Sequence, residues 1–224
     1  FSKKGSWSFL DWSPDDKKVI VRRYISINES YIHVVEINNN KMTRFNDSEE
    51  KISYGNVLYS KDGKGMYYTS DEGTEFRHLR YYDIRSDKHT ILTKHIDWDV
   101  RGFTLSDNGK YIAFVTNEDA ISKLNVVRTK DFKEIKIPNL PIGQIGSLKF
   151  NSDNNRLALT LNTPRSPGDI FVVDLKKSRL TRWTESEVGG LNNNQFVVPE
   201  LVHVNSFDGL KVSGFLYRPK TKGP

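Results

Sequence analysis

The sequence contains no cysteine among its 224 residues, so disulfide bonds and thiolate metal sites are excluded. No apolar run approaches the roughly 20 residues that a membrane-spanning helix requires. No two histidines have the spacing of a helical zinc site, and no Gly-rich loop ends in the Lys-Ser or Lys-Thr pair that holds phosphate. The sequence therefore predicts no metal, no cofactor and no membrane partner, and it leaves cytoplasm and periplasm equally open because no targeting segment is visible.

Catalytic patterns are missing as well. The Gly-x-Ser-x-Gly turn that exposes a nucleophilic serine does not occur. The acidic pairs Asp15-Asp16 and Glu49-Glu50 are interpreted as solvated turn residues, because nothing indicates a dry pocket that would separate their pKa values. No catalytic residue is therefore assigned to any position.

The net charge is 34 − 28 = +6, yet the basic residues are spread along the whole chain. The densest group, Lys17, Lys18, Arg22 and Arg23, straddles an apolar stretch. Charged side chains at sheet edges also discourage strand-to-strand aggregation, so we interpret them as solvated edges and predict no nucleic-acid partner.

The strongest signal present is an internal repeat. Four turn segments begin at aligned positions separated by 47, 46 and 45 residues: Ser13, Ser60, Ser106 and Asn151. A second set of aligned positions, each at the end of an apolar stretch, has steps of 47, 45 and 46 residues: Glu36, Asp83, Arg128 and Asp174. A period of 40 to 50 residues is typical of β-propeller blades.

The apolar residues of each repeat stand on consecutive positions, as in Val19-Ile20-Val21 and Met66-Tyr67-Tyr68. Strands of this kind are covered on both faces, which radially stacked blades achieve. We predict an all-β fold: a β-propeller fragment of four four-stranded blades over residues 1–187, with blades at about 3–48, 49–95, 96–141 and 142–187.

Within a blade, we call the four strands A to D. The A–B turns are tight, whereas we expect longer, varied B–C loops at 26–30, 70–78, 117–122 and 162–168. Loops on a rigid scaffold usually carry binding, so the face that bears them is the predicted functional face. The candidate residues for substrate or partner binding are Glu72, Glu75, Phe76, Arg77, His78 and Arg165. The alternative, that the second loop simply caps its own blade, is favoured.

The repeat ends after Glu185. Residues 188–200 are rich in Gly and Asn and are predicted to form a linker. The pair Asp208-Gly209 between two apolar runs predicts a hairpin, which we expect to open a new domain over residues 201–224.

Several of these motifs together resemble a known family: Ser-Pro-Asp-Asp and Ser-Lys-Asp-Gly turns, then Val198-Pro199-Glu200-Leu201-Val202, Ser206-Phe207-Asp208-Gly209 and Gly214-Phe215-Leu216-Tyr217-Arg218-Pro219. This combination resembles the prolyl oligopeptidase family of serine peptidases, in its dipeptidyl aminopeptidase and acylaminoacyl peptidase branch. The resemblance implies a seven- or eight-bladed propeller over an α/β-hydrolase domain that carries the catalytic triad. It therefore implies that residues 201–224 are the first strands of that domain, and that the rest of it and further blades lie outside this sequence.

Two functions follow as expectations. The first is a non-catalytic propeller that gates access and helps to select peptide substrates for a serine peptidase, with the hydrolase domain of the same protein as its partner. The second is a propeller scaffold of the TolB kind that binds another protein. Four blades can close a ring, but if these four belong to a larger ring, their open apolar faces predict self-association.

Overall fold

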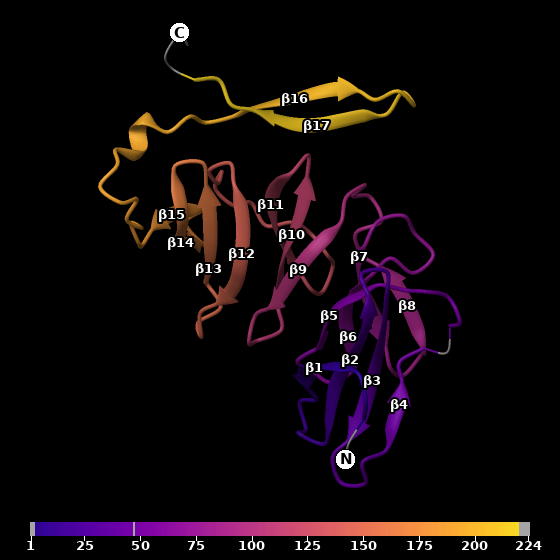
Figure 1. The fold of residues 1–224 in the computed structure, drawn as a ribbon. Coiled ribbons are helices and arrows are strands. Elements are labelled where there is room, and N and C mark those ends of the chain that lie inside the picture. Colours follow the sequence, from indigo (N-terminus) through magenta and orange to yellow (C-terminus); the bar gives the residue numbers. More distant parts are fainter. Residues whose placement is uncertain (1–2, 47, 220–224) are drawn as a thin grey trace.

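The structure is a computed structural model that describes residues 3–46 and 48–219. In this part of the chain, four antiparallel sheets follow one another along the sequence, and a separate hairpin follows them (Figure 1). The first sheet contains β1 (Ser6–Trp12), β2 (Lys18–Ser26), β3 (Glu29–Glu36) and β4 (Met42–Arg44). The second contains β5 (Tyr54–Tyr59), β6 (Gly65–Ser70), β7 (His78–Asp83) and β8 (Lys88–Ile91). The third contains β9 (Val100–Leu105), β10 (Tyr111–Glu118) and β11 (Ile121–Arg128). The fourth contains β12 (Gln144–Phe150), β13 (Arg156–Thr163), β14 (Ser166–Asp174) and β15 (Arg179–Arg182).

The four aligned turn positions form the same corner in four successive sheets. Each directly follows the first strand of its sheet, and its side-chain oxygen accepts a hydrogen bond of 2.8–2.9 Å from the backbone N–H five residues later. Each backbone carbonyl also accepts a 2.9 Å bond from the residue three positions later. That residue has a φ between 57° and 70° in every sheet: Asp16, Gly63, Gly109 and Asn154. The third strands end at the second set of aligned positions, so the predicted repeat register is confirmed.

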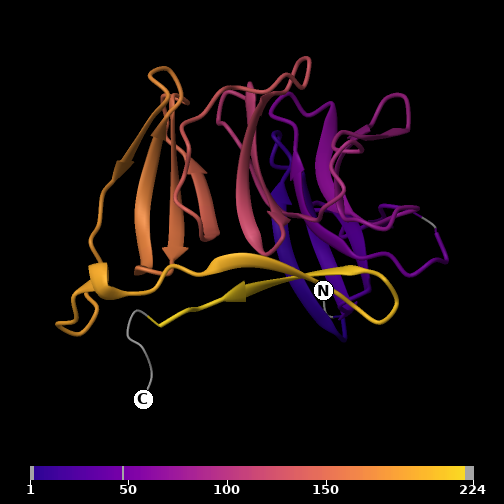
Figure 2. The same cartoon turned by 90° about the horizontal axis from the view of Figure 1, so that it is seen from above.

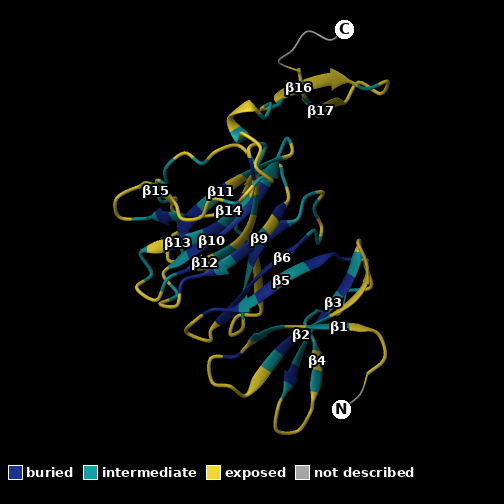
Figure 3. Cartoon of the chain, turned by 60° about the vertical axis from the view of Figure 1, so that its left-hand side comes forward, coloured by how far each residue is buried: buried dark blue, intermediate teal, exposed yellow. Residues whose placement is uncertain are grey.

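The sheets pack face to face in sequence order. One apolar cluster joins the first two sheets around Ile20, Val57 and Tyr68, and another joins the second and third around Leu79 and Phe114. A third cluster joins the third and fourth sheets. The first strands are also neighbours, with β1 beside β5, β5 beside β9 and β9 beside β12. Figure 3 shows most of the buried residues on the strands and few on the turns that join them. Each fully buried large side chain contributes about 1.5–3 kcal/mol to stability.

The prediction of four strands in every sheet is wrong for the third sheet, which has three strands among the described residues. The segment after β11 forms one isolated bridge, between Val127 and Glu134. The Ile135 N–H donates to the Val126 carbonyl at 2.7 Å, and the pairing ends there. Pro138, a few residues further on, has no N–H to extend a ladder.

The B–C connections also differ from the prediction. Three of them are two-residue turns, at residues 27–28, 119–120 and 164–165, and only the second sheet has a long loop, at residues 71–77. Short turns suffice because the second and third strands of a blade are adjacent and antiparallel. The second loop is therefore the one long B–C insertion in the part of the chain that the structure describes.

The segment after the fourth sheet contains a short 3-10 turn, η1 (Asn193–Gln195), and the hairpin of β16 (Glu200–Asn205) and β17 (Lys211–Leu216). The predicted hairpin turn is confirmed: Gly209 has φ 84° and its N–H donates to the Ser206 carbonyl at 3.0 Å. The predicted ranges 1–187 and 201–224 include residues 1–2, 47 and 220–224, which lie outside the described residues.

The outer face of the first sheet has no neighbouring sheet among the described residues. Cross-strand pairing places Trp7, Phe9 and Trp12 of β1 on this face, opposite Arg23, Val21 and Val19. Phe9 and Trp12 are 54% and 48% exposed, and their rings lie 6.1 Å apart. Aromatic side chains exposed together on a sheet face are typical of a surface that another sheet or protein covers.

Candidate functional site: the B–C face

The B–C face is the end of the sheets that carries the B–C turns. Figure 1 shows β16 and β17 lying across this end, beyond the strands of the third and fourth sheets, and Figure 2 shows the same arrangement from above. The face therefore presents two features: the long second loop and the docked hairpin.

The second loop is held by a buried arginine of its own sheet. Arg80 on β7 is 5% exposed, and its guanidinium donates to the Glu72 carbonyl and, at 3.1 Å, to the Thr74 hydroxyl. The Glu72 carboxylate lies 3.9 Å from the same guanidinium and accepts a 3.0 Å bond from Asn46. Glu72 thus connects the loop to the segment between the first two sheets. This arrangement matches the capping interpretation of the loop.

Asn46 also donates to the hydroxyl of Tyr54, at the start of β5. Burial raises the pKa of Tyr54 well above its ordinary value, and the nearby Glu72 carboxylate raises it further. The phenol therefore stays protonated and cannot serve as a base at neutral pH.

Arg77 and His78 are occupied by structural contacts. The Arg77 guanidinium donates to the Ser53 hydroxyl at 2.8 Å, and its backbone N–H donates to the Asp99 carboxylate at 2.8 Å. His78 is 4% exposed, and its Nδ1 lies 3.4 Å from the Thr93 hydroxyl. Burial, together with the charge of Arg80, lowers the pKa of His78. Arg77 thus ties the second sheet to the segments before and after it, and His78 contacts the segment that follows β8.

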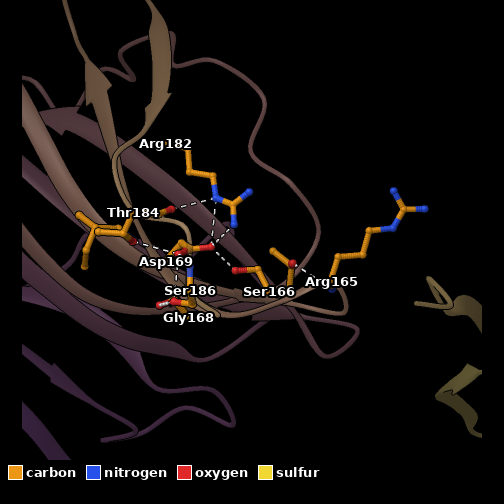
Figure 4. A network of polar contacts seen from close by, with 9 residues as sticks. Arg165, Ser166, Gly168, Asp169, Arg182, Thr184 and Ser186 are labelled. Atoms are coloured by element: carbon orange, nitrogen blue, oxygen red, sulfur yellow. Dashed lines mark hydrogen bonds and ion pairs between the residues drawn. The ribbon is translucent and has the colours of Figure 1, made fainter. Parts of the chain in front are cut away.

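The remaining candidates are more accessible. Glu75 is exposed, Phe76 is half-buried, and Arg165 is exposed at the tip of the turn between β13 and β14. Figure 4 shows the Arg165 side chain pointing away from the polar network around Asp169. Arg165 belongs to the fourth sheet and the loop cluster to the second, so the structure does not join the six candidates into one site. Binding by Glu75, Phe76 and Arg165 stays a prediction.

A buried carboxylate four residues after Arg165 was not among the predicted site residues. Asp169 on β14 is fully buried, and it accepts hydrogen bonds from the Arg182 guanidinium at 3.0 Å and from the Thr184 hydroxyl at 2.9 Å (Figure 4). The Ser166 hydroxyl and the backbone N–H of Ser186 donate to it as well. Burial alone would raise the pKa of Asp169, but these donors outweigh it and lower the pKa far below its ordinary range.

The strand pattern contains a signal for this site. Asp169 has the same parity on β14 as Phe171 and Val173, whose side chains are in the core. A carboxylate in a core register requires charged or multiple hydrogen-bond partners, and Arg182 has the matching register on β15. The network attaches the end of the fourth sheet to the chain that leads toward the hairpin.

The hairpin contacts the B–C turn of the third sheet. Asp119 in that turn accepts a hydrogen bond from the Ser213 hydroxyl, and its carboxylate lies 3.4 Å from Nε2 of His203. A cavity of about 200 Å³ lies beside this contact, between the turns of the third and fourth sheets and the hairpin. Pro164, Phe215 and Tyr217 contribute apolar walls to it. Its volume is below the range of about 300–1,000 Å³ that is typical of pockets for drug-sized ligands.

The described residues contain neither a cluster suited to a metal ion nor a helix suited to a membrane span. No group of three or more His, Cys, Asp or Glu side chains is arranged to hold a metal ion in them. None of their helices has the length and apolar character needed to span a bilayer.

Comparisons with known proteins place this fold. No protein-family model and no curated protein sequence matches the chain. Solved structures do match: a prolyl endopeptidase is similar with a TM-score of 0.76 and 18% identity, over 96% of this chain and 31% of that one. Prolyl oligopeptidase B from Galerina marginata, bound to a 25-residue macrocyclization substrate, is similar with a TM-score of 0.75 and 16% identity, over 93% of this chain and 30% of that one. A puromycin hydrolase is similar with a TM-score of 0.77 and 14% identity, over 96% of this chain and 34% of that one.

The TM-scores show a likeness of fold, and at sequence identities of 14–18% the likeness concerns the fold alone. The neighbours are prolyl oligopeptidases and a puromycin hydrolase, so they support the resemblance to the propeller portion of prolyl oligopeptidase-family peptidases. The chain spans about a third of the length of these solved chains. The dipeptidyl aminopeptidase branch stays a prediction.

Proposed function

We propose that this chain is the propeller portion of a serine peptidase of the prolyl oligopeptidase family, in which it gates access and helps to select peptide substrates. The fold likeness to prolyl oligopeptidases supports the family. The absence of the Gly-x-Ser-x-Gly pattern in the sequence accords with a non-catalytic role for these residues.

The observation that carries the proposal is the orientation of the hairpin. His203 and Ser213 are paired across the two strands and face the sheets. Successive residues of a strand alternate between faces, so Val204 and its partner Val212 face away from the sheets. They are 60% and 49% exposed.

A two-stranded hairpin with an exposed apolar face is marginally stable alone. We therefore propose that Val202, Val204, Val212 and Leu216 are covered by the hydrolase domain, of which β16 and β17 are the first strands. This domain would stand over the B–C face, so a peptide would reach it through or around the propeller.

The gating role is tested in the full-length protein by comparing substrates of two sizes. Paired cysteines placed on β1 and on the propeller strand that faces it in the full-length protein would lock the ring, and the chain itself supplies no competing thiol. If the propeller gates access, locking it slows hydrolysis of a peptide of about 20 residues at least tenfold more than that of a dipeptide ester, and reductant restores both rates. Equal slowing of the two substrates contradicts gating. Full-length protein with no hydrolase activity favours the scaffold function instead.

A further inference from the structure

We propose that the turn at Asp119 and Ala120 is a preformed docking point that fixes the orientation of the hairpin β16–β17 on the propeller. The inference deepens the proposed function, because this hairpin would orient the domain that follows it. The contact itself lies wholly within the described residues and is testable on this chain.

The turn is unusual among the two-residue B–C turns of this chain. Asp119 and Ala120 both have positive φ, 51° and 63°, whereas no residue of the other two-residue turns does. A left-handed backbone is unfavourable for residues with a Cβ, and glycine or asparagine is the usual solution for consecutive positions of this kind. Here the sequence keeps an aspartate and an alanine in that conformation.

With this turn conformation, β10 and β11 remain paired up to the turn that joins them. The pairing of β10 with β11 is uninterrupted from Tyr111–Arg128 to Glu118–Ile121. The pairs β2–β3 and β13–β14 both have a register shift next to their turns. A register shift bends a strand, so its absence directs the Asp119 turn outward from the B–C face.

The turn is also braced from the neighbouring sheet. The side-chain amide of Gln144, at the start of β12 in the fourth sheet, donates to the Ala120 carbonyl, and the Ser122 N–H donates to the Gly143 carbonyl at 3.1 Å. The carboxylate of the adjacent Glu118 does not bind β16 or β17, because Lys123 and the Thr116 hydroxyl engage it. Asp119 is thus held in place by bonds that exist without the hairpin.

The hairpin supplies matching groups. Ser213 and His203 form a cross-strand pair, so their side chains lie side by side and both reach the Asp119 carboxylate. The hydrogen bond from Ser213 lowers the pKa of Asp119, which remains a carboxylate at neutral pH. Among the described residues, the other side-chain hydrogen bond or ion pair of the hairpin strands joins Glu200 to Arg218, within the hairpin segment itself.

The test measures the distance between the hairpin and the sheets in this chain. The chain lacks cysteine, so spin labels at Phe207→Cys, in the hairpin turn, and Asp153→Cys, in a turn at the opposite end of the fourth sheet, would be the only labels present. Pulsed electron–electron double resonance is expected to give one narrow distribution of the distance between the two labels. In Asp119→Ala the distribution is expected to become at least twofold broader.

The matched control is Asp107→Ala, which removes an exposed carboxylate from the other end of the third sheet and is expected to leave the distribution unchanged. The double variant His203→Ala with Ser213→Ala removes the same contact from the hairpin side and should reproduce the broadening, even if Asp119→Ala weakens its sheet. An unchanged distribution in that double variant would overturn the proposal. The measurement does not depend on peptidase activity, so a failure of the proposed function would leave its result intact.

Discussion

Asp169 accepts a hydrogen bond of 2.7 Å from the backbone N–H of Ser186, a residue 17 positions later that lies beyond the last strand of the fourth sheet. The same carboxylate binds the Arg182 guanidinium at 3.0 Å, so one buried side chain ties β14, β15 and the departing chain together. Such a carboxylate organises the end of the propeller segment before the chain crosses toward the hairpin.

The first prediction concerns this network. Asp169→Ala removes the acceptor of the Arg182 guanidinium, of the Ser186 backbone N–H and of three hydroxyls, those of Ser166, Thr184 and Ser186. The free energy of unfolding is therefore expected to fall by about 3 kcal/mol at pH 7. Urea denaturation measures the change, with Asp153→Ala in an exposed turn as the control. A loss below about 0.5 kcal/mol would contradict the structural role of Asp169.

The second prediction follows from the lowered pKa of Asp169. A carboxyl group whose pKa is lower in the folded chain stabilises it fully above the unfolded value, and this contribution decreases as the pH falls toward the folded value. The difference in stability between the parent chain and Asp169→Asn is therefore expected to be constant from pH 5 to pH 7 and to shrink below about pH 4. Thermal unfolding across this range tests it; a difference that grows on acidification would oppose it.

The third prediction concerns His78. Burial lowers its pKa from the ordinary value of 6.5, so the unfolded chain binds the proton more readily. Stability is expected to decrease as the pH falls below about 6.5, toward the lowered folded-state pKa. His78→Gln should reduce this decrease, which thermal unfolding at pH 7.5 and pH 5.5 measures. An identical pH dependence in the variant would show that His78 does not contribute.

The fourth prediction compares two glycines. A Cβ on Gly65 of β6 would lie 2.3 Å from the Tyr82 carbonyl oxygen and 2.4 Å from the Tyr81 ring, whereas one on Gly102 of β9 would meet nothing within 4 Å. Gly65→Ala is expected to lower the free energy of unfolding by about 1–3 kcal/mol. Gly102→Ala, the control, should change it by less than about 0.5 kcal/mol. Comparable losses in both variants would place the neighbouring strand β7 differently from the structure.

The fifth prediction concerns the open face of the first sheet. Phe9 and Trp12 are exposed there, so the isolated chain is expected to self-associate. Light scattering at increasing concentration should show a mass above 25.8 kDa, and Phe9→Ser with Trp12→Ser should reduce it. Trp183→Ser, which removes an exposed aromatic side chain from the end of the fourth sheet, is the control. A monomeric parent chain at all concentrations would contradict the prediction.

The sequence predicted most of the fold because its determinants are local. A serine or asparagine oxygen five residues before its N–H partner, with glycine, asparagine or aspartate in the left-handed position between them, specifies each corner without reference to the rest of the chain. The absence of a fourth strand from the third sheet was not predicted, since the length of an edge strand depends on its pairing as well as on its apolar pattern.

The site was predicted less well, because its contacts are distant in sequence. The Asp119–Ser213 contact joins residues 94 positions apart, and no local pattern indicates it. The loop at Glu72 was found from its composition, but composition does not reveal that Arg80 and Asn46 engage the carboxylate. Asp169 was detectable in principle, because alternation along β14 assigns it to the core face.

Fluorophosphonate labelling of the full-length protein, beside this chain alone, shows whether these sheets belong to a serine peptidase. We expect the full-length protein to be labelled at one serine outside residues 1–224 and the isolated chain to remain unlabelled. A correctly folded full-length protein that takes up no label, or a label within residues 1–224, would contradict the assignment to a serine peptidase.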